Sequence, residues 1–530
     1  MTVVQTLVVL IFFAIGIGLV ARRIGMPYPV ALVLGGLVLG FIRQLPNLEF
    51  DPDYVFFFFL PPLLYHAAVF TSWRDFRHDI GSISLLAVGL VAATTVAVAA
   101  VAHSLIPGMP WAAAVALGAI VSPPDAICAT AAMANTKIPR RLVTVIEGES
   151  LVNDASGLVI YKYAVLAAVT GGLSAWDAAA DFIVVGPGGI AIGAILGFLL
   201  LRLQRRVVDP MIEVTVSLTT PFAVYIVADR LGTSGVLAVV TAGLIRGWYA
   251  PEVLTPQTRI RAFAAWDVLV FILNSIVFIL IGSELDDIVQ DLPSYSLRDL
   301  LSYSLAVSAT AILVRFLWVF ASVYLARFLP ARWRGPKQTS WREAVILAWS
   351  GMRGVVSLAA ALALLVNTAS GEPFPARELT AFLTFAVIFV TLVIQGLTIA
   401  PLARWLGVKA DDISDREERL ARHEIVRAAL AEVERAAPAA GIAADVLAAV
   451  RAEIVRQIEE TAAMEEGAGD TEKAAAAKAR RDLLLAAIAA QRRELIRLRR
   501  KRAIGDDVMH RIERELDLQE AMLSEPVSAG

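Results

Sequence analysis

Long apolar runs, separated by short polar segments, fill most of the chain from its start to about residue 405. The hydrocarbon core of a bilayer is about 30 Å thick, so a helix needs roughly 20 mostly apolar residues to cross it. We therefore predict an all-α polytopic membrane protein with about 13 transmembrane helices. The predicted spans are residues 3–21, 28–42, 54–71, 80–103, 110–134, 143–169, 181–203, 211–229, 232–247, 262–283, 297–325, 341–367 and 377–403.

Basic residues divide the connecting segments into two sets. The segment after the first predicted span, and every second segment beyond it, contain most of the arginines and lysines. The other set contains only Arg43, Arg230, Arg298 and Arg377. Because arginine and lysine collect on the cytoplasmic side of membrane proteins, we expect the N-terminus outside and the C-terminal segment in the cytoplasm. We predict a multi-pass protein of the cytoplasmic (inner) membrane.

The composition agrees with a membrane protein and argues against several functions. Hydrophobic residues make up 58% of the chain and charged residues 18%, against roughly 25% charged residues in soluble proteins. The net charge of -2 argues against nucleic-acid binding. The single cysteine, Cys128, excludes an internal disulfide and a multi-cysteine metal site. The chain shows no nucleotide-binding loop or enzymatic motif, so we expect neither an enzyme nor a cofactor.

The character of the sequence changes near Ala410, where charged, helix-prone segments replace the apolar runs. Pro438 and Gly467–Gly469 interrupt these segments. We predict a transmembrane domain at residues 1–405 and a cytoplasmic helical domain at residues 406–530. The tail is either a solubilising or dimer-packing segment or a regulatory domain, since charged helices are usually solvated.

Ionisable residues occur inside several predicted spans, where a charge costs a few kcal/mol. At about 1.5 Å per residue, Asp154 and Arg353 lie about 16 and 18 Å from the cytoplasmic face. Asp125 and His66 lie about 22 and 18 Å from the outer face. Helices far apart in the sequence therefore bring ionisable groups to the middle of the membrane, where such groups mark a functional site by default.

The sixth predicted span contains Glu-Gly-Glu-Ser-Leu-Val-Asn-Asp at residues 147–154. Ser150 and Asp154 are one helical turn apart, and Glu149 and Asn153 form the adjacent stripe. These hard oxygen ligands suit a small hard cation rather than a soft metal. Asp154 is the predicted carrier, because an isolated carboxylate at this depth must be neutralised by a proton or by a sodium-like cation. The alternative is a structural carboxylate.

The fifth predicted span, residues 110–134, and the twelfth, residues 341–367, each contain a segment that breaks a helix. Prolines remove amide donors and free backbone carbonyls, and non-helical backbone within a membrane must line a cavity or be buried in protein. Broken helices in corresponding halves of a chain mark the site of a secondary transporter. The spacing of these two spans predicts an inverted repeat. The backbone residues of the two breaks are Ser122, Pro123, Pro124, Gly351 and Gly354.

Arg353 keeps its charge and needs a buried anion or a comparable partner. We predict that Glu149 is this partner and that the ion pair holds two helices around the site. The alternatives are a helix C-terminus, whose carbonyls attract cations, or Glu343. Arg315 shows no partner in the sequence and is interpreted as structural. His66 is a possible accessory residue, although a membrane histidine is more often simply hydrogen-bonded.

These features together resemble the cation:proton antiporter 1 family, which contains bacterial sodium/proton antiporters and the animal sodium/proton exchangers. The resemblance covers residues 1–405 and rests on Glu149–Asp154, Gly351–Gly354, Leu60–Leu64 and the break at Asp125. It implies that Asp154 carries the cation and the proton, and that Ser150 and Asp125 contribute to the cation site. Asn153 stands where electrogenic relatives have a second aspartate, which implies electroneutral exchange.

The resemblance also implies an ion pair of Glu149 with Arg353, a homodimer, and two broken helices that cross at the midplane. A core bundle, spans 4–6 and 11–13 here, would move against a dimerisation scaffold. The chain departs from the family at Pro124, where many relatives have threonine, and at His66, where relatives often have a carboxylate.

The resulting hypothesis is a secondary active antiporter that exchanges a monovalent cation for protons by alternating access. The expected partners are sodium, with lithium or potassium as other cations, protons, the lipid bilayer and a second copy of the chain. A potassium/proton antiporter is the nearest alternative. A cation channel is an alternative of a different class, and it would need a continuous water-lined path.

Overall fold

The computed structural model describes residues 3–40, 52–134, 136, 138–170, 175–207, 209–290, 295–325, 339–364, 374–408, 424–425, 427–436, 444–465, 471–501, 512 and 515–520. It divides into two compact units, Met1–Asp411 and Asp412–Gly530. Every regular element among the described residues is helical, which confirms the predicted all-α class.

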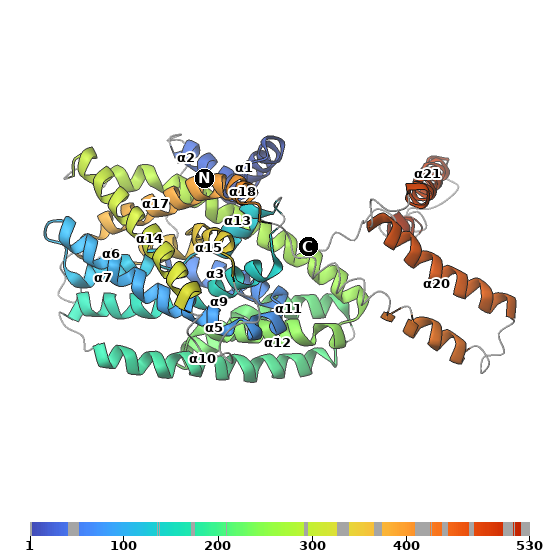
Figure 1. Cartoon of the computed structure of the whole chain (residues 1–530), viewed down its shortest axis with the longest axis horizontal. Helices are drawn as coiled ribbons and strands as arrows, with labels where there is room; N and C mark the ends of the chain where they lie inside the picture. Colours follow the sequence, from blue (N-terminus) through green and yellow to red (C-terminus); the bar gives the residue numbers. More distant parts are fainter. Residues whose placement is uncertain are drawn as a thin grey trace. The chain divides into compact units, whose positions relative to one another are not determined.

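The first unit is a bundle of helices (Figure 1). Its elements are α1 (Val3–Ile24), α2 (Tyr28–Gly40), α3 (Pro52–Phe70), α4 (Trp73–His78), α5 (Ile80–Ser84), η1 (Leu85–Leu90), α6 (Val91–Leu105), α7 (Trp111–Val121), α8 (Ala126–Met133), α9 (Arg140–Thr170), α10 (Ala175–Gln204), α11 (Pro210–Arg230), α12 (Gly235–Val253), α13 (Pro256–Gln290), α14 (Leu297–Leu325), α15 (Trp341–Trp349), α16 (Val355–Leu362), α17 (Arg377–Phe389), η4 (Val390–Gln395) and α18 (Gly396–Leu406).

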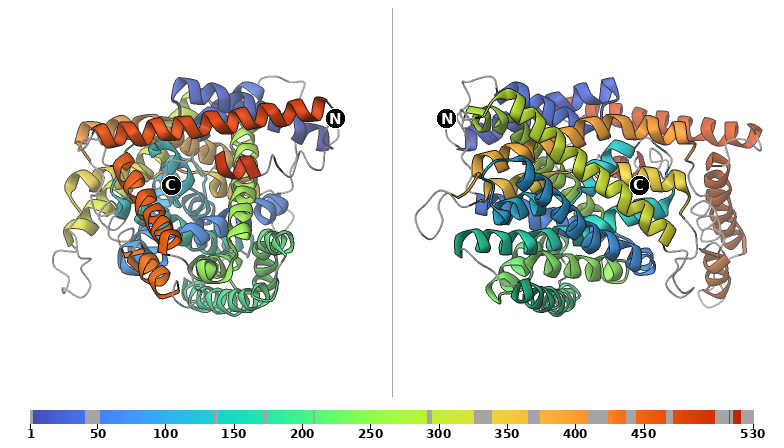
Figure 2. Two further views of the ribbon diagram at one scale, coloured as in Figure 1. Left: turned by 90° about the vertical axis from the view of Figure 1, so that its right-hand side faces the viewer. Right: turned by 60° about the vertical axis from the view of Figure 1, so that its left-hand side comes forward.

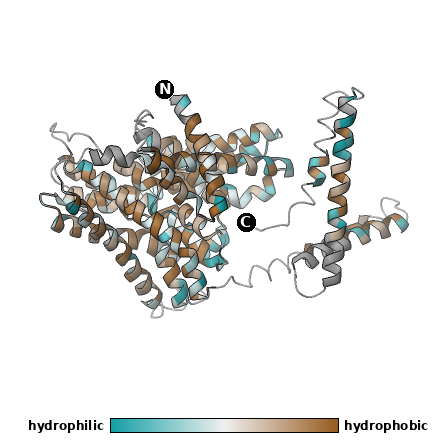
Figure 3. Cartoon of the chain, turned by 90° about the horizontal axis from the view of Figure 1, so that it is seen from above, coloured by the Kyte–Doolittle hydropathy of each residue, from teal (hydrophilic) through white to brown (hydrophobic). Residues whose placement is uncertain are grey.

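Seven helical segments among the described residues are long and apolar enough to cross a membrane, and two shorter helices are also apolar. The seven are Ile80–Leu105, Trp111–Met133, Val184–Gln204, Pro210–Arg230, Pro256–Ser283, Leu297–Tyr324 and Arg377–Leu406. Hydrophobic residues dominate the helices of this unit (Figure 3). The protein is thus an integral membrane protein, while the count of thirteen spans stays a prediction. Arg43 and the last residues of predicted spans 2 and 12 lie outside the described residues.

Close helix packing builds the frame around the functional residues (Figure 2). Helix α10 runs along α12, and α12 runs along α3, while α2 packs along α13. Gly193 permits the first of these contacts, because a Cβ atom there would overlap the backbone carbonyl of Ala238. A Cβ on Gly282 would likewise overlap the backbone of α2 at Val33. Such close approach of small residues is the usual way in which helices associate in lipid.

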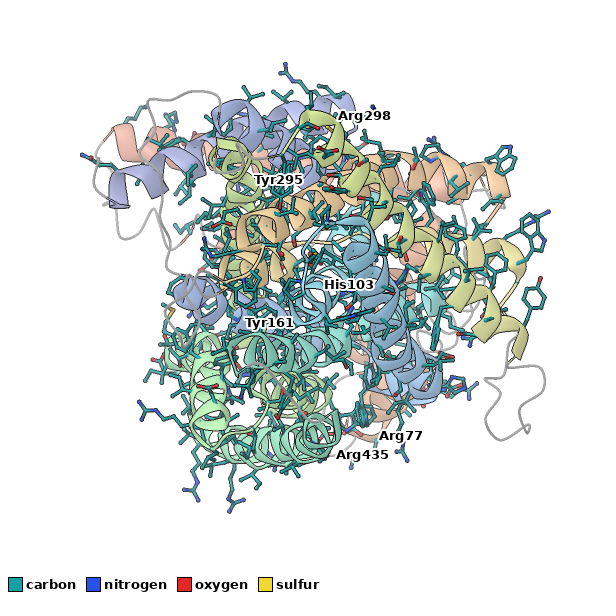
Figure 4. All side chains as sticks on the ribbon, turned by 90° about the vertical axis from the view of Figure 1, so that its left-hand side faces the viewer. Arg77, His103, Tyr161, Tyr295, Arg298 and Arg435 are labelled. Carbon is teal, nitrogen blue, oxygen red and sulfur yellow. The ribbon has the colours of Figure 1, made fainter. Side chains whose placement is uncertain are left out.

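The turn between α6 and α7 sets where the first broken helix starts. The Nδ1 atom of His103 donates to the backbone carbonyl of Met109 at 2.7 Å, and its ring stacks on Trp111 with the ring centroids 4.3 Å apart. Figure 4 labels His103 at this end of α6. Helix α7 therefore begins from an anchored turn, and its far end carries the residues discussed below.

The second unit contains α20 (Ala444–Glu465) and α21 (Thr471–Arg500). Ile488 and Leu495 of α21 pack with Leu516 in a small apolar cluster, and Arg492 forms ion pairs with Asp517 and Glu520. The predicted breaks at Pro438 and Gly467–Gly469 lie outside the described residues.

Candidate functional site

The two broken helices cross, and their backbones are in contact at the breaks. Helix α7 ends at Val121 and α8 begins at Ala126, while α15 ends at Trp349 and α16 begins at Val355. The backbone amide of Asp125 in the first break donates to the backbone carbonyl of Met352 in the second, at 2.7 Å. We call these two non-helical segments, 122–125 and 350–354, the crossing. The predicted breaks are therefore present, and they lie in direct contact.

Glycine makes this contact possible. A Cβ atom on Gly354 would overlap the Oδ2 atom of Asp125 and would lie 2.7 Å from its Cγ atom. The carboxylate of Asp125 thus lies against the start of α16, and no larger residue fits between them. Gly351 makes room for Arg315 in the same way, because a Cβ atom on Gly351 would lie 2.6 Å from the Nε atom of Arg315.

Asp125 is the N-cap of α8. Its Oδ1 atom accepts the backbone amide of Ile127 at 2.8 Å, and its Oδ2 atom accepts the thiol of Cys128 at 3.4 Å. An N-cap carboxylate satisfies amide donors that the first helical turn leaves free, and the positive end of the helix dipole stabilises its charge. The carboxylate is therefore held in one orientation within the crossing.

Helix α9 lies along the first break and hydrogen-bonds to it twice. The amide side chain of Asn153 donates to the backbone carbonyl of Pro124 at 2.8 Å, and the backbone amide of Ala126 donates to the hydroxyl of Ser150 at 3.2 Å. A Cβ on Gly157 would lie 2.5 Å from the Cγ atom of Pro123, so this glycine lets α9 approach closely. Ser150 and Asn153, two of the predicted ligand residues of α9, thus face the break.

Asp154 lies next to this contact. Its side chain is buried, and it is close enough to Asp125 for the two carboxylates to repel each other electrostatically. Among the described residues, neither a hydrogen bond nor an ion pair involves the Asp154 carboxylate. The Oδ1 atom of Asn153 is also buried without a hydrogen-bond partner in the described part of the chain. Three oxygen-bearing side chains predicted from the sequence therefore gather at one place.

The predicted pairing of Glu149 with Arg353 is wrong. Glu149 instead forms a bidentate ion pair with Arg315 of α14, with N–O distances of 2.6 and 2.9 Å. Both side chains are almost fully buried, with 1% and 2% of their surfaces exposed. Arg315 also donates to the backbone carbonyl of Leu347, near the end of α15, at 3.1 Å. The ion pair therefore joins α9, α14 and the second broken helix.

Arg353 has the partner that was the alternative expectation, a helix C-terminus. Its Nε atom donates to the carbonyl of Val121, the last residue of α7, at 3.0 Å, and its Nη1 atom donates to Gly351. Its backbone amide donates to the hydroxyl of Thr391 at 3.2 Å. Carbonyls at a helix C-terminus carry partial negative charge. In a continuous helix the Asp125 amide would bond to Val121, but here it donates to Met352 and leaves that carbonyl to Arg353.

Ser122 and His66, two of the remaining predicted residues, contact side chains of other helices. The Ser122 hydroxyl donates to the carbonyl of Ala119 at 3.2 Å and accepts from Thr95 at 3.3 Å. His66 stacks near Phe70 and Trp266, with ring centroids 4.5 and 5.9 Å away. No contact in the described part of the chain joins His66 to Asp154, and its accessory role stays a prediction.

The buried charges around the crossing do not balance. Arg315 and Arg353 contribute two positive charges, which interact electrostatically with each other and with Glu149. Glu149, Asp125 and Asp154 contribute three negative charges when all are ionised. The group therefore has one excess negative charge, and a single monovalent cation or a single proton neutralises it. Burial of an uncompensated charge is costly, so this site favours binding one of the two.

Sequence reasoning missed three contributors. Arg315 lies ten residues from the end of its span, about 15 Å from the cytoplasmic face, and Glu149 lies about 9 Å from it. An arginine side chain covers that difference, so depth alone was a signal for this pair. Cys128 follows Asp125 by three positions, the spacing at which a side chain reaches an N-cap residue. Thr391 carried no signal in the sequence.

Known proteins are similar to this chain over most of its length. The family model described as "Sodium/hydrogen exchanger, transmembrane" matches residues 8–405. A protein of Mycobacterium bovis named an uncharacterised Na+/H+ exchanger is 34% identical over 94% of this chain and 92% of the relative. A Bacillus pumilus protein named a sodium, potassium, lithium and rubidium/H+ antiporter is 32% identical over 76% of this chain and 62% of its own length.

A solved structure shares the fold. It is that of the sodium/proton antiporter MjNhaP1 from Methanocaldococcus jannaschii, with a TM-score of 0.60 and 18% sequence identity. The match covers 76% of this chain and 98% of the antiporter. Together with the family match, it confirms the resemblance drawn from residues 149–154 and 351–354.

Proposed function

Because the chain belongs to the sodium/hydrogen exchanger family, we propose that it is a secondary active antiporter that exchanges sodium for protons across the cytoplasmic membrane. The observation that carries the proposal is the buried Asp154 carboxylate beside Asp125, at the crossing of two broken helices. Asp154 binds either the cation or the proton, and Asp125, Ser150 and Asn153 supply oxygen atoms around it. Each loaded state then crosses the membrane in the opposite direction.

The charge balance supports electroneutral exchange. One excess negative charge remains when Glu149, Asp125 and Asp154 are all ionised beside two arginines. One sodium ion or one proton removes this excess, so the two loaded states have the same net charge. The unloaded state keeps an uncompensated charge, which disfavours its passage through the bilayer. This difference couples the two fluxes one for one.

The proposal also includes the conformational change, the oligomeric state and the membrane topology. Alternating access proceeds by motion of a core bundle, spans 4–6 and 11–13, against a scaffold within a homodimer. The chain crosses the membrane in thirteen spans with inverted repeats, and the arginines and lysines of alternate connecting segments favour an outside N-terminus and a cytoplasmic helical tail. Glu149 and Arg315 hold the core helices together, and the crossing supplies the backbone partners of α9.

Replacing Asp154 tests the proposal. We expect Asp154→Asn to abolish sodium-dependent proton movement in reconstituted vesicles, because a neutral amide takes up no proton near neutral pH and lacks the negative charge that the cation neutralises. Asp267→Asn is the control, since this aspartate of α13 belongs to no part of the crossing described above. Retained exchange in a folded Asp154→Asn protein would refute the mechanism. Voltage-driven current through wild-type protein would indicate the channel alternative instead.

A potassium/proton antiporter is the second candidate. The Bacillus pumilus relative is named for sodium, potassium, lithium and rubidium, and the oxygen ligands at Asp154 are compatible with each of these ions. Proton flux driven by each cation in turn, in the same vesicles, distinguishes the candidates. A lower KM for potassium than for sodium would favour the second.

A further inference from the structure

We propose that Gln395 is a positioning residue of the second break, residues 350–354, and that its side-chain amide binds the backbone of this break in another state of the transport cycle. The proposal rests on the proposed function, because it concerns how the same crossing changes during exchange. Gln395 is the last residue of the π-helical turn η4 and is fully buried. Neither its Nε2 atom nor its Oε1 atom has a hydrogen-bond partner among the described residues.

Contacts on both sides of Gln395 locate it relative to the second break. The backbone amide of Arg353 donates to the hydroxyl of Thr391, which precedes Gln395 by one turn. The indole of Trp349, the last residue before the break, donates at 2.9 Å to the hydroxyl of Thr398, which follows Gln395 by one turn. Residues one turn apart share a face of a helix. Gln395 therefore lies on the helix face that contacts the second break.

The helix that carries Gln395 approaches the break closely. A Cβ atom on Gly396, the next residue, would lie 2.9 Å from the Cγ2 atom of Val30 and 3.8 Å from the Sδ atom of Met352, within the break. Single π-helical turns inside a longer helix occur frequently at functional sites. The buried amide of Gln395 thus belongs to a local irregularity of the helix next to the crossing, and not to a regular part of the apolar core.

Asn153 shows what a side-chain amide does at the first break. Its nitrogen donates to the backbone carbonyl of Pro124 at 2.8 Å. A side-chain amide has the same kinds of donor and acceptor as a peptide group, so it replaces bonds that a broken helix lacks. In the proposed inverted repeat, α9 corresponds to the helix that contains Gln395, as the first broken helix corresponds to the second. Gln395 is therefore placed to serve the second break as Asn153 serves the first.

The unpaired state of Gln395 points to a second arrangement of the break. A buried polar atom without a hydrogen bond destabilises a protein, and Gln395 contains two such atoms. The second break frees backbone amides and carbonyls that its two helices do not bond. A local shift of the break toward η4 satisfies groups on both sides. Gln395 stabilises this shifted arrangement, and the transport cycle passes through it.

The first test removes the amide and keeps the size of the side chain. In the full-length protein reconstituted in vesicles, we expect Gln395→Met to lower the maximal rate of sodium-driven proton movement about tenfold or more, with the KM for sodium within about twofold. The KM is retained because the oxygens around Asp154 are unchanged. The Tm in detergent should rise, because the substitution removes two unpaired buried polar atoms. A merely structural residue would not combine a slower rate with a higher Tm.

Gln204→Met is the matched control. Gln204 is the last residue of α10, and it is also a buried glutamine with neither polar atom bonded among the described residues. It belongs to no part of the crossing. The Tm of this variant should rise for the same reason as in Gln395→Met, while its exchange rate should equal that of the wild type.

Hydrogen exchange of backbone amides tests the shift of the break directly. In the wild-type protein, we expect the deuterium uptake of residues 349–354 to differ between sodium chloride and choline chloride at the same pH. Gln395→Met should remove this difference, and Gln204→Met should retain it. If Gln395→Met does not fold, the measurement on the wild-type protein decides the question.

Several outcomes would overturn the inference. They are an unchanged maximal rate in folded Gln395→Met, a lower Tm in that variant, an equal loss of rate in Gln204→Met, or no effect of sodium on deuterium uptake in the wild type. A lower Tm would mean that the amide is bonded in the resting fold and has a structural role.

The two proposals fail in different ways. Retained exchange in Asp154→Asn contradicts the antiport mechanism itself. Loss of exchange in Asp154→Asn, combined with a normal maximal rate in Gln395→Met, leaves the mechanism intact and removes only the role of Gln395.

Discussion

The buried ion pair of Glu149 and Arg315 holds helices together next to the candidate site. Two hydrogen bonds join the charges, and the arginine also donates to the end of α15 at Leu347. A buried bidentate pair is specific in its geometry, but its net stability is small because both charges lose their water. Its value lies in fixing α9 and α14 relative to the crossing.

Removal of one partner should be much more damaging than removal of both. We expect Arg315→Ala to destabilise the protein by about 3–5 kcal/mol, because it leaves the buried Glu149 charge unpaired. Thermal unfolding in detergent measures the change as a lower Tm. The double substitution Glu149→Leu with Arg315→Met should recover much of the loss, since well-packed apolar residues can replace a buried pair.

Arg353→Ala is the matched comparison for this pair. It removes donors to Val121 and Gly351 but leaves Glu149 paired, so its Tm should fall less than that of Arg315→Ala. A greater loss in Arg353→Ala, or no recovery in the double variant, would mean that Glu149 depends on Arg353 after all.

The wrong prediction of a Glu149–Arg353 pair shows that a residue pattern does not give the direction of a side chain outside a regular helix. Spacing and depth along a helix place Glu149, Asp154 and Arg353 at nearby heights in the membrane. They do not give the direction in which a residue of a non-helical segment points. Arg353 lies inside such a segment, and its side chain turns to the nearest free carbonyls. Arg315 lies on a regular helix, where height and face together would have indicated Glu149.

At the scale of elements, the two broken helices act as one unit. Each break frees carbonyls at the end of one helix and amides at the start of the next. Arg353 and Arg315 donate to the carbonyls of α7 and α15, respectively, and Asp125 accepts from the start of α8. The sequence predicts these breaks because proline and glycine disrupt a helix whatever surrounds it. Their contact through Asp125 and Met352 depends on tertiary packing.

Gly354 tests whether the contact of the breaks is needed for transport. We expect Gly354→Ala to abolish exchange, because the added methyl group would occupy the position of the Asp125 carboxylate. Exchange in vesicles and size-exclusion chromatography in detergent measure activity and folding separately. Normal exchange in Gly354→Ala would show that the Asp125 carboxylate need not occupy this position.

Gly16→Ala is the control for this substitution. A Cβ at Gly16, on α1, has no neighbouring atom within 4 Å, and alanine is the better helix former. Its exchange activity should equal that of the wild type. A defect in this variant would point to a general sensitivity of glycine positions in the bundle.

The whole molecule consists of two compact units, and every residue of the candidate site lies in the first, Met1–Asp411. The described part of the second unit has its own apolar cluster and its own ion pairs. Sequence composition indicated this change of character near Ala410, because charged helix formers replace apolar runs. It does not indicate what the tail binds, since solvated charged helices serve many purposes.

A chain that ends at Asp411 should therefore still exchange cations for protons. The physical reason is that Asp154, Asp125 and both arginines keep all the contacts described above, none of which involves residues of the second unit. We expect a maximal rate within about twofold of the full chain, measured in vesicles at matched protein content. A changed pH profile at an equal maximal rate would identify the tail as regulatory. Loss of exchange in a truncated protein that remains folded would mean that transport requires the tail.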